Sequence, residues 1–227
     1  MRARAATALR GCYNRRPAPE GGRVGDVKPA PDRSAVEAFI LAGGQSRRMG
    51  RDKARLALDG VPLVLALARG IAPGVARVRV VCKPGTAFDD CGLECVHDRE
   101  EETALVHGVR AALAVPGAAW RWLLACDMPG IDAGILAALW AAARAGGALG
   151  SAPRLPGASA PEPLPSLWHR DLLARVRPAW GHAARDWVRE AELALWDVPP
   201  AWAARFANLN TPAQWRAYVE RRPGGQS

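Results

Sequence analysis

The chain has 227 residues, 49% of them hydrophobic, and this length suits one large α/β domain with a substantial core. Its apolar residues come in short runs, far below the roughly 20 unbroken residues that cross a bilayer, so the protein is expected to be soluble, with no membrane partner. The formal net charge is +9, but residues 1–35 hold eight basic and three acidic side chains. The rest of the chain is therefore only mildly basic, and a nucleic-acid partner is not expected.

Residues 1–35 mix Arg, Ala, Pro and Gly without apolar periodicity, which predicts a disordered basic extension in front of a domain at 36–227. Arg2, Arg4 and Arg10 interrupt any apolar run, and this argues against a secretory signal. An organellar presequence and a start codon assigned too far upstream both stay open.

Beyond residue 35, short apolar strands alternate with helical segments. Apolar and β-branched runs predict strands at 36–42, 76–82, 93–96, 120–126 and 193–198. Helical patterns, two of them opened by Pro62 and Asp132, predict helices at 62–69, 103–115, 132–144, 171–176, 183–190 and 212–221. Residues 146–165 are rich in Gly, Pro and Ala, and we expect a loop-bearing insertion there with an extended or edge strand. The alternation predicts a mostly parallel sheet with helices on both faces and a ligand site beyond the carboxyl ends of its strands.

The five cysteines are odd in number and lack the paired spacing of a disulfide scaffold or a zinc ribbon. They are Cys12, Cys82, Cys91, Cys95 and Cys126. Cys91 and Cys95 have neither a CxxC spacing nor a histidine partner, so we interpret them as structural thiols. Unpaired thiols fit a reducing compartment, and we expect the protein in the cytoplasm.

The segment from Leu41 to Lys53 has the sequence LAGGQSRRMGRDK and follows the first predicted strand directly. Glycines at this place let backbone N–H groups approach an anion, because no Cβ blocks the approach. Arg48 and Lys53 add positive charge, so the segment is expected to bind a polyphosphate. A surface glycine turn with solvated arginines is the alternative. The spacing is neither that of a Walker loop nor that of GxGxxG.

A second motif, WLLACDMP at 122–129, is an apolar strand that delivers one carboxylate, Asp127, at its carboxyl end. Mg²⁺ prefers oxygen ligands and often takes only one or two carboxylates, with phosphates and water as the others. Asp127 is therefore a candidate metal ligand, and a carboxylate that caps the following turn is the alternative.

A third motif, NLNTP at 208–212, opens the last predicted helix. Thr211 suits the position that caps the helix, and Pro212 suits its first turn. The motif by itself therefore predicts a helix start.

The segment 41–53 matches every fixed position of LAGGxSxRMGxDK, the signature of the cofactor nucleotidyltransferases, and it resembles most closely the molybdenum cofactor guanylyltransferase family. The resemblance implies a Rossmann-like three-layer α/β/α nucleotidyltransferase fold with a mostly parallel sheet. It also implies that the backbone of Leu41, Ala42 and Gly43 contacts the nucleotide, that Gly44 belongs to the same loop, and that Lys53 contacts the phosphates.

The same resemblance extends from Val36 to about Tyr218 and assigns further roles by position. It implies that Asp127 is the Mg²⁺ ligand and also contacts the nucleotide, and that Asp98 contacts the nucleotide as well. Asn208 and Asn210 match a family segment near the metal and the acceptor phosphate.

A reaction follows from these roles. The resemblance implies transfer of GMP from GTP to the phosphate of molybdopterin, with Mg²⁺ as cofactor and pyrophosphate as the second product. The acceptor is already an anion, so catalysis consists of positioning and charge neutralisation, with Lys53, Arg48 and Asp127 as the catalytic residues. Molybdoenzyme maturation proteins are expected as protein partners.

The sequence departs from the family pattern at two loops on the side where the base and ribose are expected. These are Cys82–Pro84, in place of Asn-x-Asn, and Ala104–Gly108, in place of Gly-Pro-Leu-Ala-Gly. Three alternatives to the GTP-dependent enzyme therefore stay open: a CTP-dependent transferase acting on molybdopterin, a transferase for another NTP and phosphorylated acceptor, and a catalytically silent nucleotide-binding partner in molybdoenzyme maturation.

Overall fold

The structure is a computed structural model that describes residues 30–42, 53–58, 60–100, 104–177 and 184–220. Three predicted site residues, Gly43, Gly44 and Arg48, lie outside the described residues, as do residues 1–29 of the expected N-terminal extension.

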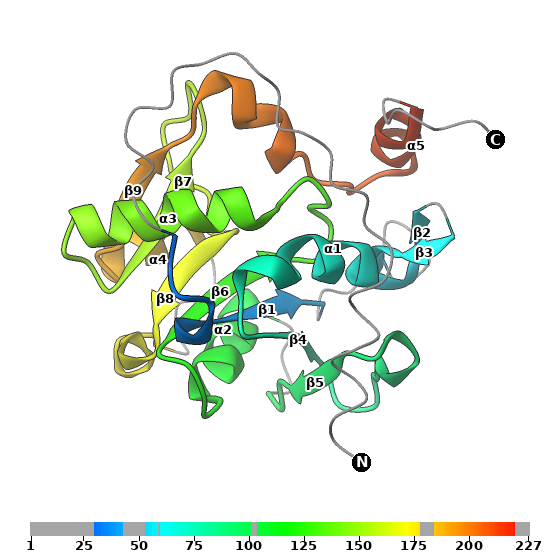
Figure 1. The fold of residues 1–227 in the computed structure, drawn as a ribbon, viewed down its shortest axis with the longest axis horizontal. Helices are drawn as coiled ribbons and strands as arrows, with labels where there is room; N and C mark the ends of the chain where they lie inside the picture. Colours follow the sequence, from blue (N-terminus) through cyan, green and yellow to red (C-terminus); the bar gives the residue numbers. More distant parts are fainter. Residues whose placement is uncertain (1–29, 43–52, 59, 101–103, 178–183, 221–227) are drawn as a thin grey trace.

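A seven-stranded sheet organises the described residues, with strand order β5-β4-β1-β6-β8-β7-β9 (Figure 1). Its strands are β1 (Val36–Leu41), β4 (Arg77–Cys82), β5 (Glu94–His97), β6 (Trp120–Ala125), β7 (Gly150–Arg154), β8 (Ser166–His169) and β9 (Ala194–Asp197). Neighbouring strands run parallel except where β8 pairs with β6 and β7 in the antiparallel sense. A separate small hairpin joins β2 (Ala57–Leu58) to β3 (Val61–Pro62).

Helices cover both faces of the sheet. The central strand β1 is therefore buried on both sides. Side chains alternate along a strand, so Ala38 and Ile40 belong to one apolar cluster while Phe39 and Leu41 belong to the other. The helices are α1 (Leu63–Ile71), α2 (Leu105–Ala114), α3 (Ala133–Ala145), α4 (Ala184–Glu190) and α5 (Pro212–Glu220). Helices α1 and α3 supply the first cluster, and α2 and α4 supply the second. The predicted three-layer, mostly parallel architecture is confirmed.

The elements predicted from the sequence are present with bounds shifted by a few residues, apart from two segments. Residues 171–176, expected to be a helix, form instead the short 3-10 helix Arg170–Ala174. Within 146–165, expected to be a loop-bearing insertion with an edge strand, Gly150–Arg154 forms β7, which lies between β8 and β9.

Two residues explain how β7 takes an inner position. A Cβ at Gly150 would lie 2.5 Å from the Leu167 carbonyl oxygen, so only glycine lets the strand approach β8 this closely. Pro153 is paired only with β9, because the pairing with β8 covers Gly150 and Ser151 alone. The proline, which has no N–H to donate, therefore sits where no donor toward β8 is required.

A short turn precedes Val36, the expected start of the domain. Arg33–Ala35 form a 3-10 turn capped by the Asp32 carboxylate, which accepts a hydrogen bond from the Ser34 N–H at 3.0 Å. The Arg33 guanidinium donates to the Val75 carbonyl at 3.1 Å and so anchors this turn to the loop before β4.

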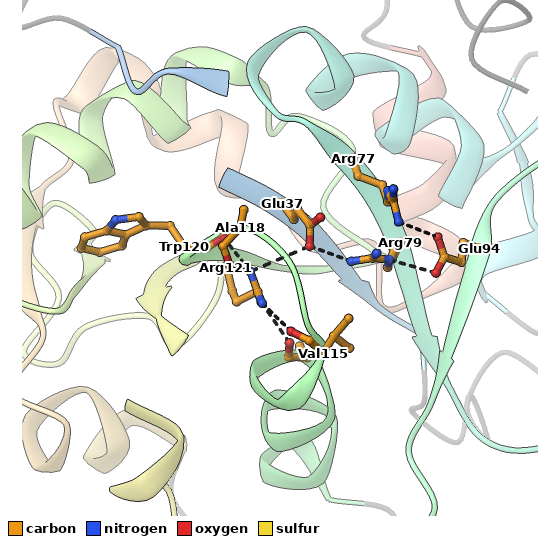
Figure 2. Close-up of polar contacts among 9 residues, drawn as sticks. Glu37, Arg77, Arg79, Glu94, Val115, Ala118, Trp120 and Arg121 are labelled. Atoms are coloured by element: carbon orange, nitrogen blue, oxygen red, sulfur yellow. Dashed lines mark hydrogen bonds and ion pairs between the residues drawn. The ribbon is translucent and has the colours of Figure 1, made fainter. Parts of the chain in front are cut away.

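A buried charged network occupies the amino-terminal end of the sheet (Figure 2). Arg79 on β4 donates to the Glu37 carboxylate on β1 at 2.6 Å, and the fully buried Arg121 on β6 lies 3.8 Å from the same oxygen. Arg121 also donates to carbonyl groups at the end of α2, including that of Val115 at 2.5 Å. Each buried charge therefore has charged or carbonyl partners, which buried ions require.

None of the helices in the described part of the chain combines the length and the apolar character needed to cross a membrane.

Candidate active site

The parallel strands bring several predicted site residues to one edge of the sheet. The register pairs Leu41 with Val81 on one side and with Ala125 on the other, so β1, β4 and β6 end at nearly the same level. Residues just beyond these ends, including Ala42 and Asp127, emerge at the carboxyl edge. Ligands of such sheets bind at this edge.

Three polar side chains from distant segments meet there. The Lys53 ammonium lies 2.6 Å from Asn210 Oδ1, to which it donates a hydrogen bond, and 3.5 Å from Asp127 Oδ2. The side chains of Lys53 and Asp127 are 17% and 15% exposed, so each is shielded by protein and still open to a ligand. The structure thus brings together three of the predicted site residues.

Local packing fixes the two ends of this cluster. Lys53 opens the 3-10 helix Lys53–Arg55, and the next residue, Ala54, is fully buried in the core beneath α1. On the other side, the N–H of the buried Leu209 donates to the Asp127 backbone carbonyl at 2.9 Å. The segment before α5 is therefore attached to the turn that carries the carboxylate.

A reciprocal capping box holds Asn210 at the start of α5. Gln214 Oε1 accepts from the N–H groups of Asn210 and Thr211 at 2.8 Å and 3.0 Å, and Thr211 Oγ1 accepts from the Gln214 N–H at 3.1 Å. The predicted cap by Thr211 is confirmed. Sequence reasoning missed Gln214, although the spacing Thr-x-x-Gln is the signature of this motif.

Asp98 lies at the same edge but outside this cluster. It follows β5, which is separated from β1 by β4. Its buried carboxylate accepts from the Lys83 ammonium at 2.9 Å and from the Glu100 N–H at 3.1 Å. Lys83 belongs to the departing Cys82–Pro84 loop, and sequence reasoning did not foresee its pairing with Asp98.

The other predicted site residues within the described ranges differ in burial and in hydrogen bonding. The Ala42 N–H donates to the Val81 carbonyl at 2.8 Å, so this donor is engaged within the sheet edge. Leu41 is buried, and a Cβ built at Gly108 would lie 3.6 Å from its side chain. Asn208 is exposed.

The donor set at this edge fits a magnesium ion that shares its ligands with a substrate. Asp127 offers a carboxylate and Asn210 an amide oxygen, the hard donors that Mg²⁺ prefers. Within the described ranges, no group of three or more His, Cys, Asp or Glu side chains gathers to hold a metal. A metal here would therefore take its other ligands from phosphates and water.

Fold and site together define a protein of the nucleotidyltransferase class. The family model for the MobA-like NTP transferase domain matches residues 38–195, so the chain belongs to this family.

Named relatives cover most of the chain. The molybdenum cofactor guanylyltransferase of Pseudomonas paraeruginosa is 35% identical over 186 residues, which cover 77% of this chain and 89% of that protein. That of Pseudomonas fluorescens is 33% identical over 193 residues, which cover 82% and 93%. The solved structure of molybdopterin-guanine dinucleotide biosynthesis protein A from Archaeoglobus fulgidus superimposes with a TM-score of 0.63 at 22% identity, covering 80% of this chain and 95% of that one. This last similarity concerns the fold.

Proposed function

We propose that the protein transfers GMP from GTP to the phosphate of molybdopterin and releases pyrophosphate, with Mg²⁺ as cofactor. One observation carries the proposal: Lys53, Asp127 and Asn210 converge at the carboxyl edge of the sheet, directly beyond the strand that precedes the glycine segment. Membership in the MobA-like family and the names of its relatives support this choice of substrates.

The proposed transfer requires positive charges at fixed positions around the reacting phosphates. The acceptor phosphate has to approach an α-phosphorus that is surrounded by negative oxygens, so cations must offset their repulsion. The Lys53 ammonium supplies one positive charge, and its hydrogen bond to Asn210 fixes its direction. Asp127 and Asn210 would hold Mg²⁺, which when bound polarises a phosphoryl oxygen.

Backbone groups and further cations complete the proposed binding mode. The backbone of Leu41 and Ala42 is proposed to contact the nucleotide, and Gly43, Gly44 and Arg48, which lie outside the described residues, are proposed to contact the phosphates. Asp98 and Asn208 are proposed as contacts to the nucleotide and to the acceptor, respectively.

A second candidate, a CTP-dependent transferase, rests on the ion pair between Lys83 and Asp98. The Asp98 carboxylate accepts from the Lys83 ammonium at 2.9 Å and from the Glu100 N–H at 3.1 Å. Lys83 lies in one of the two loops that depart from the family pattern, on the side where the resemblance places the base.

Pyrophosphate release with molybdopterin, Mg²⁺ and each of the four NTPs tests both candidates. Release with GTP alone is expected under the first candidate, and release with CTP alone would replace it by the second. No release with any NTP, together with retained NTP binding in a thermal-shift assay, would favour a catalytically silent binding partner.

We also propose that the protein acts in the cytoplasm and delivers its product to molybdoenzyme maturation proteins. No disulfide joins the four cysteines of the described part of the chain, and burial raises the pKa of the Cys91 thiol, which fits inert thiols in a reducing compartment. Cell fractionation tests the location, and recovery of the protein in an oxidising compartment would overturn this proposal.

A further inference from the structure

The C-terminal segment crosses the turn that carries Asp127 and touches it at two points. At one point the Leu209 N–H donates to the Asp127 carbonyl at 2.9 Å. At the other point the backbone of Arg205, in the 3-10 helix Pro200–Phe206, lies against Gly130 so closely that a Cβ there would be 2.5 Å from the Arg205 carbonyl oxygen. Glycine at 130 therefore permits this crossing.

The Arg205 side chain forms a third attachment. Its guanidinium is ion-paired with the Asp132 carboxylate, whose other oxygen caps α3 by accepting from the Gly134 N–H at 2.9 Å. The same guanidinium lies 4.6 Å from the centroid of the Trp202 ring, a cation–π contact that restricts its orientation. Arg205 is thus held between the start of α3 and an aromatic ring of its own segment.

These attachments lie only a few residues from the active site. Asn210 follows Leu209 directly, and its Oδ1 accepts the 2.6 Å hydrogen bond from Lys53. The buried side chains of Phe206 and Leu209 hold this segment in the protein interior, and the anchor at 205 and the bond at 209 add the polar contacts that set where Asn210 lies.

We infer that Arg205 is a positioning residue: its ion pair with Asp132 holds residues 205–210 on the turn after β6 and thereby places Asn210 against Lys53. The expected effect on catalysis rests on the proposed function. The expected effect on the position of residues 205–210 rests on geometry alone. The pair is partly exposed, with side chains 27% and 48% accessible, and exposed ion pairs add little to global stability. Its effect is therefore local.

Hydrogen exchange on the full chain tests the structural part without any activity. Arg205→Ala is expected to speed exchange of the Leu209 amide at least about tenfold, because local opening of the segment becomes easier. Asp132→Asn keeps an oxygen that can cap α3 but loses the charge, and it should act in the same direction. Arg154→Ala is the matched control, since it breaks another surface Arg–Asp pair, that with Asp197, and should leave Leu209 unchanged.

Kinetics tests the catalytic part. Arg205→Ala should lower kcat about tenfold while KM for GTP changes less than about threefold, because misplacement of Asn210 affects the transfer step more than binding. Arg205→Lys, which keeps the charge, should recover much of the rate. In an Asn210→Ala background, Arg205→Ala should cause no further loss, because Arg205 acts through Asn210.

Three outcomes would overturn the inference: unchanged Leu209 exchange in Arg205→Ala and Asp132→Asn, equal losses of kcat in Arg205→Ala and Arg154→Ala, or full additivity with Asn210→Ala. Should Arg205→Ala fail to fold, Arg205→Lys and Asp132→Asn carry the same measurements. A wild-type protein that releases no pyrophosphate with any NTP would refute the proposed function, while the exchange experiment would still decide whether Arg205 anchors the segment.

Discussion

The two edges of the sheet hold charged clusters of opposite design. At the amino edge, Glu37, Arg79 and Arg121 project from three neighbouring strands and satisfy one another and the end of α2 (Figure 2). At the carboxyl edge, Lys53 at the start of a 3-10 helix and Asp127 in the turn after β6 face each other at 3.5 Å, and both side chains are partly accessible.

The difference shows how the same chemical groups become structural or functional. Arg121 is fully buried, and this burial lowers the pKa of its guanidinium from the ordinary value, yet its partners are all part of the fold. A Cβ at Gly117, where φ is +148°, would lie 2.6 Å from Glu37 Oε2, so the loop after α2 closes this cluster tightly. At the carboxyl edge, by contrast, the partly accessible side chains of Lys53 and Asp127 remain open to a ligand as a further partner.

The sharpest test of the comparison is Asp127→Ala. We expect transfer to fall at least about 100-fold at ordinary Mg²⁺ concentrations, because the carboxylate that would hold the metal is lost. The melting temperature should stay close to that of the wild type, since the backbone carbonyl of Asp127, and not its side chain, accepts from Leu209. Pyrophosphate release over a Mg²⁺ series measures the first effect, and full activity at low Mg²⁺ would contradict the ligand role.

The converse change is Arg121→Ala at the amino edge. It removes the partner of buried carbonyls and one of the two arginines near Glu37, and we expect the free energy of unfolding to fall by about 3 kcal/mol or more. Urea denaturation measures this loss. Arg77→Ala is the matched control, because Arg77 belongs to the exposed end of the same network, 3.4 Å from Glu94, and its removal should cost little. Equal losses of unfolding free energy in the two variants would show that the buried and exposed ends of the network contribute alike.

Lys53→Ala should weaken binding of GTP by roughly tenfold, because a charge-assisted contact to a phosphate is lost. Isothermal titration calorimetry measures the affinity. Arg55→Ala, on the same 3-10 helix but paired with the exposed Asp90 at 2.7 Å, should leave the affinity unchanged. An unaltered affinity in Lys53→Ala would mean that the lysine contacts only Asn210 and Asp127 and not the nucleotide.

The smallest effect is expected for a pair outside both clusters, Arg154 with Asp197. The hydrogen bond from Arg154 holds the pKa of the Asp197 carboxyl below its ordinary value in the folded protein. The pair therefore stabilises the fold above the unfolded pKa of about 4, and this contribution disappears as the pH falls through the lower folded pKa. Melting curves of wild type and Asp197→Asn should differ by about 1 °C or less at pH 7 and converge near pH 3, because exposed pairs contribute little. A large difference that persists at low pH would exclude an electrostatic cause.

The amino-acid sequence predicts the layers of the fold and those parts of the site that depend on local order. Alternating apolar strands and helices predict the three layers, and a strand that ends in Asp127 brings this residue to the carboxyl edge in any parallel sheet. It did not determine β7, because Pro153 and Gly150 suit an inner strand only through the particular register with β8 and β9.

Tertiary structure alone decided which side chains meet. Lys53 and Asn210 are 157 positions apart, and Arg205 and Asp132 are 73 apart, so nothing in the local pattern of either partner identifies the other. The capping box at Thr211 was open to prediction because it spans a single helical turn, whereas the Lys83–Asp98 pair depends on the lateral packing of β4 and β5. Local propensity fixes secondary elements over a few residues, and side-chain contacts between loops follow from how these elements pack.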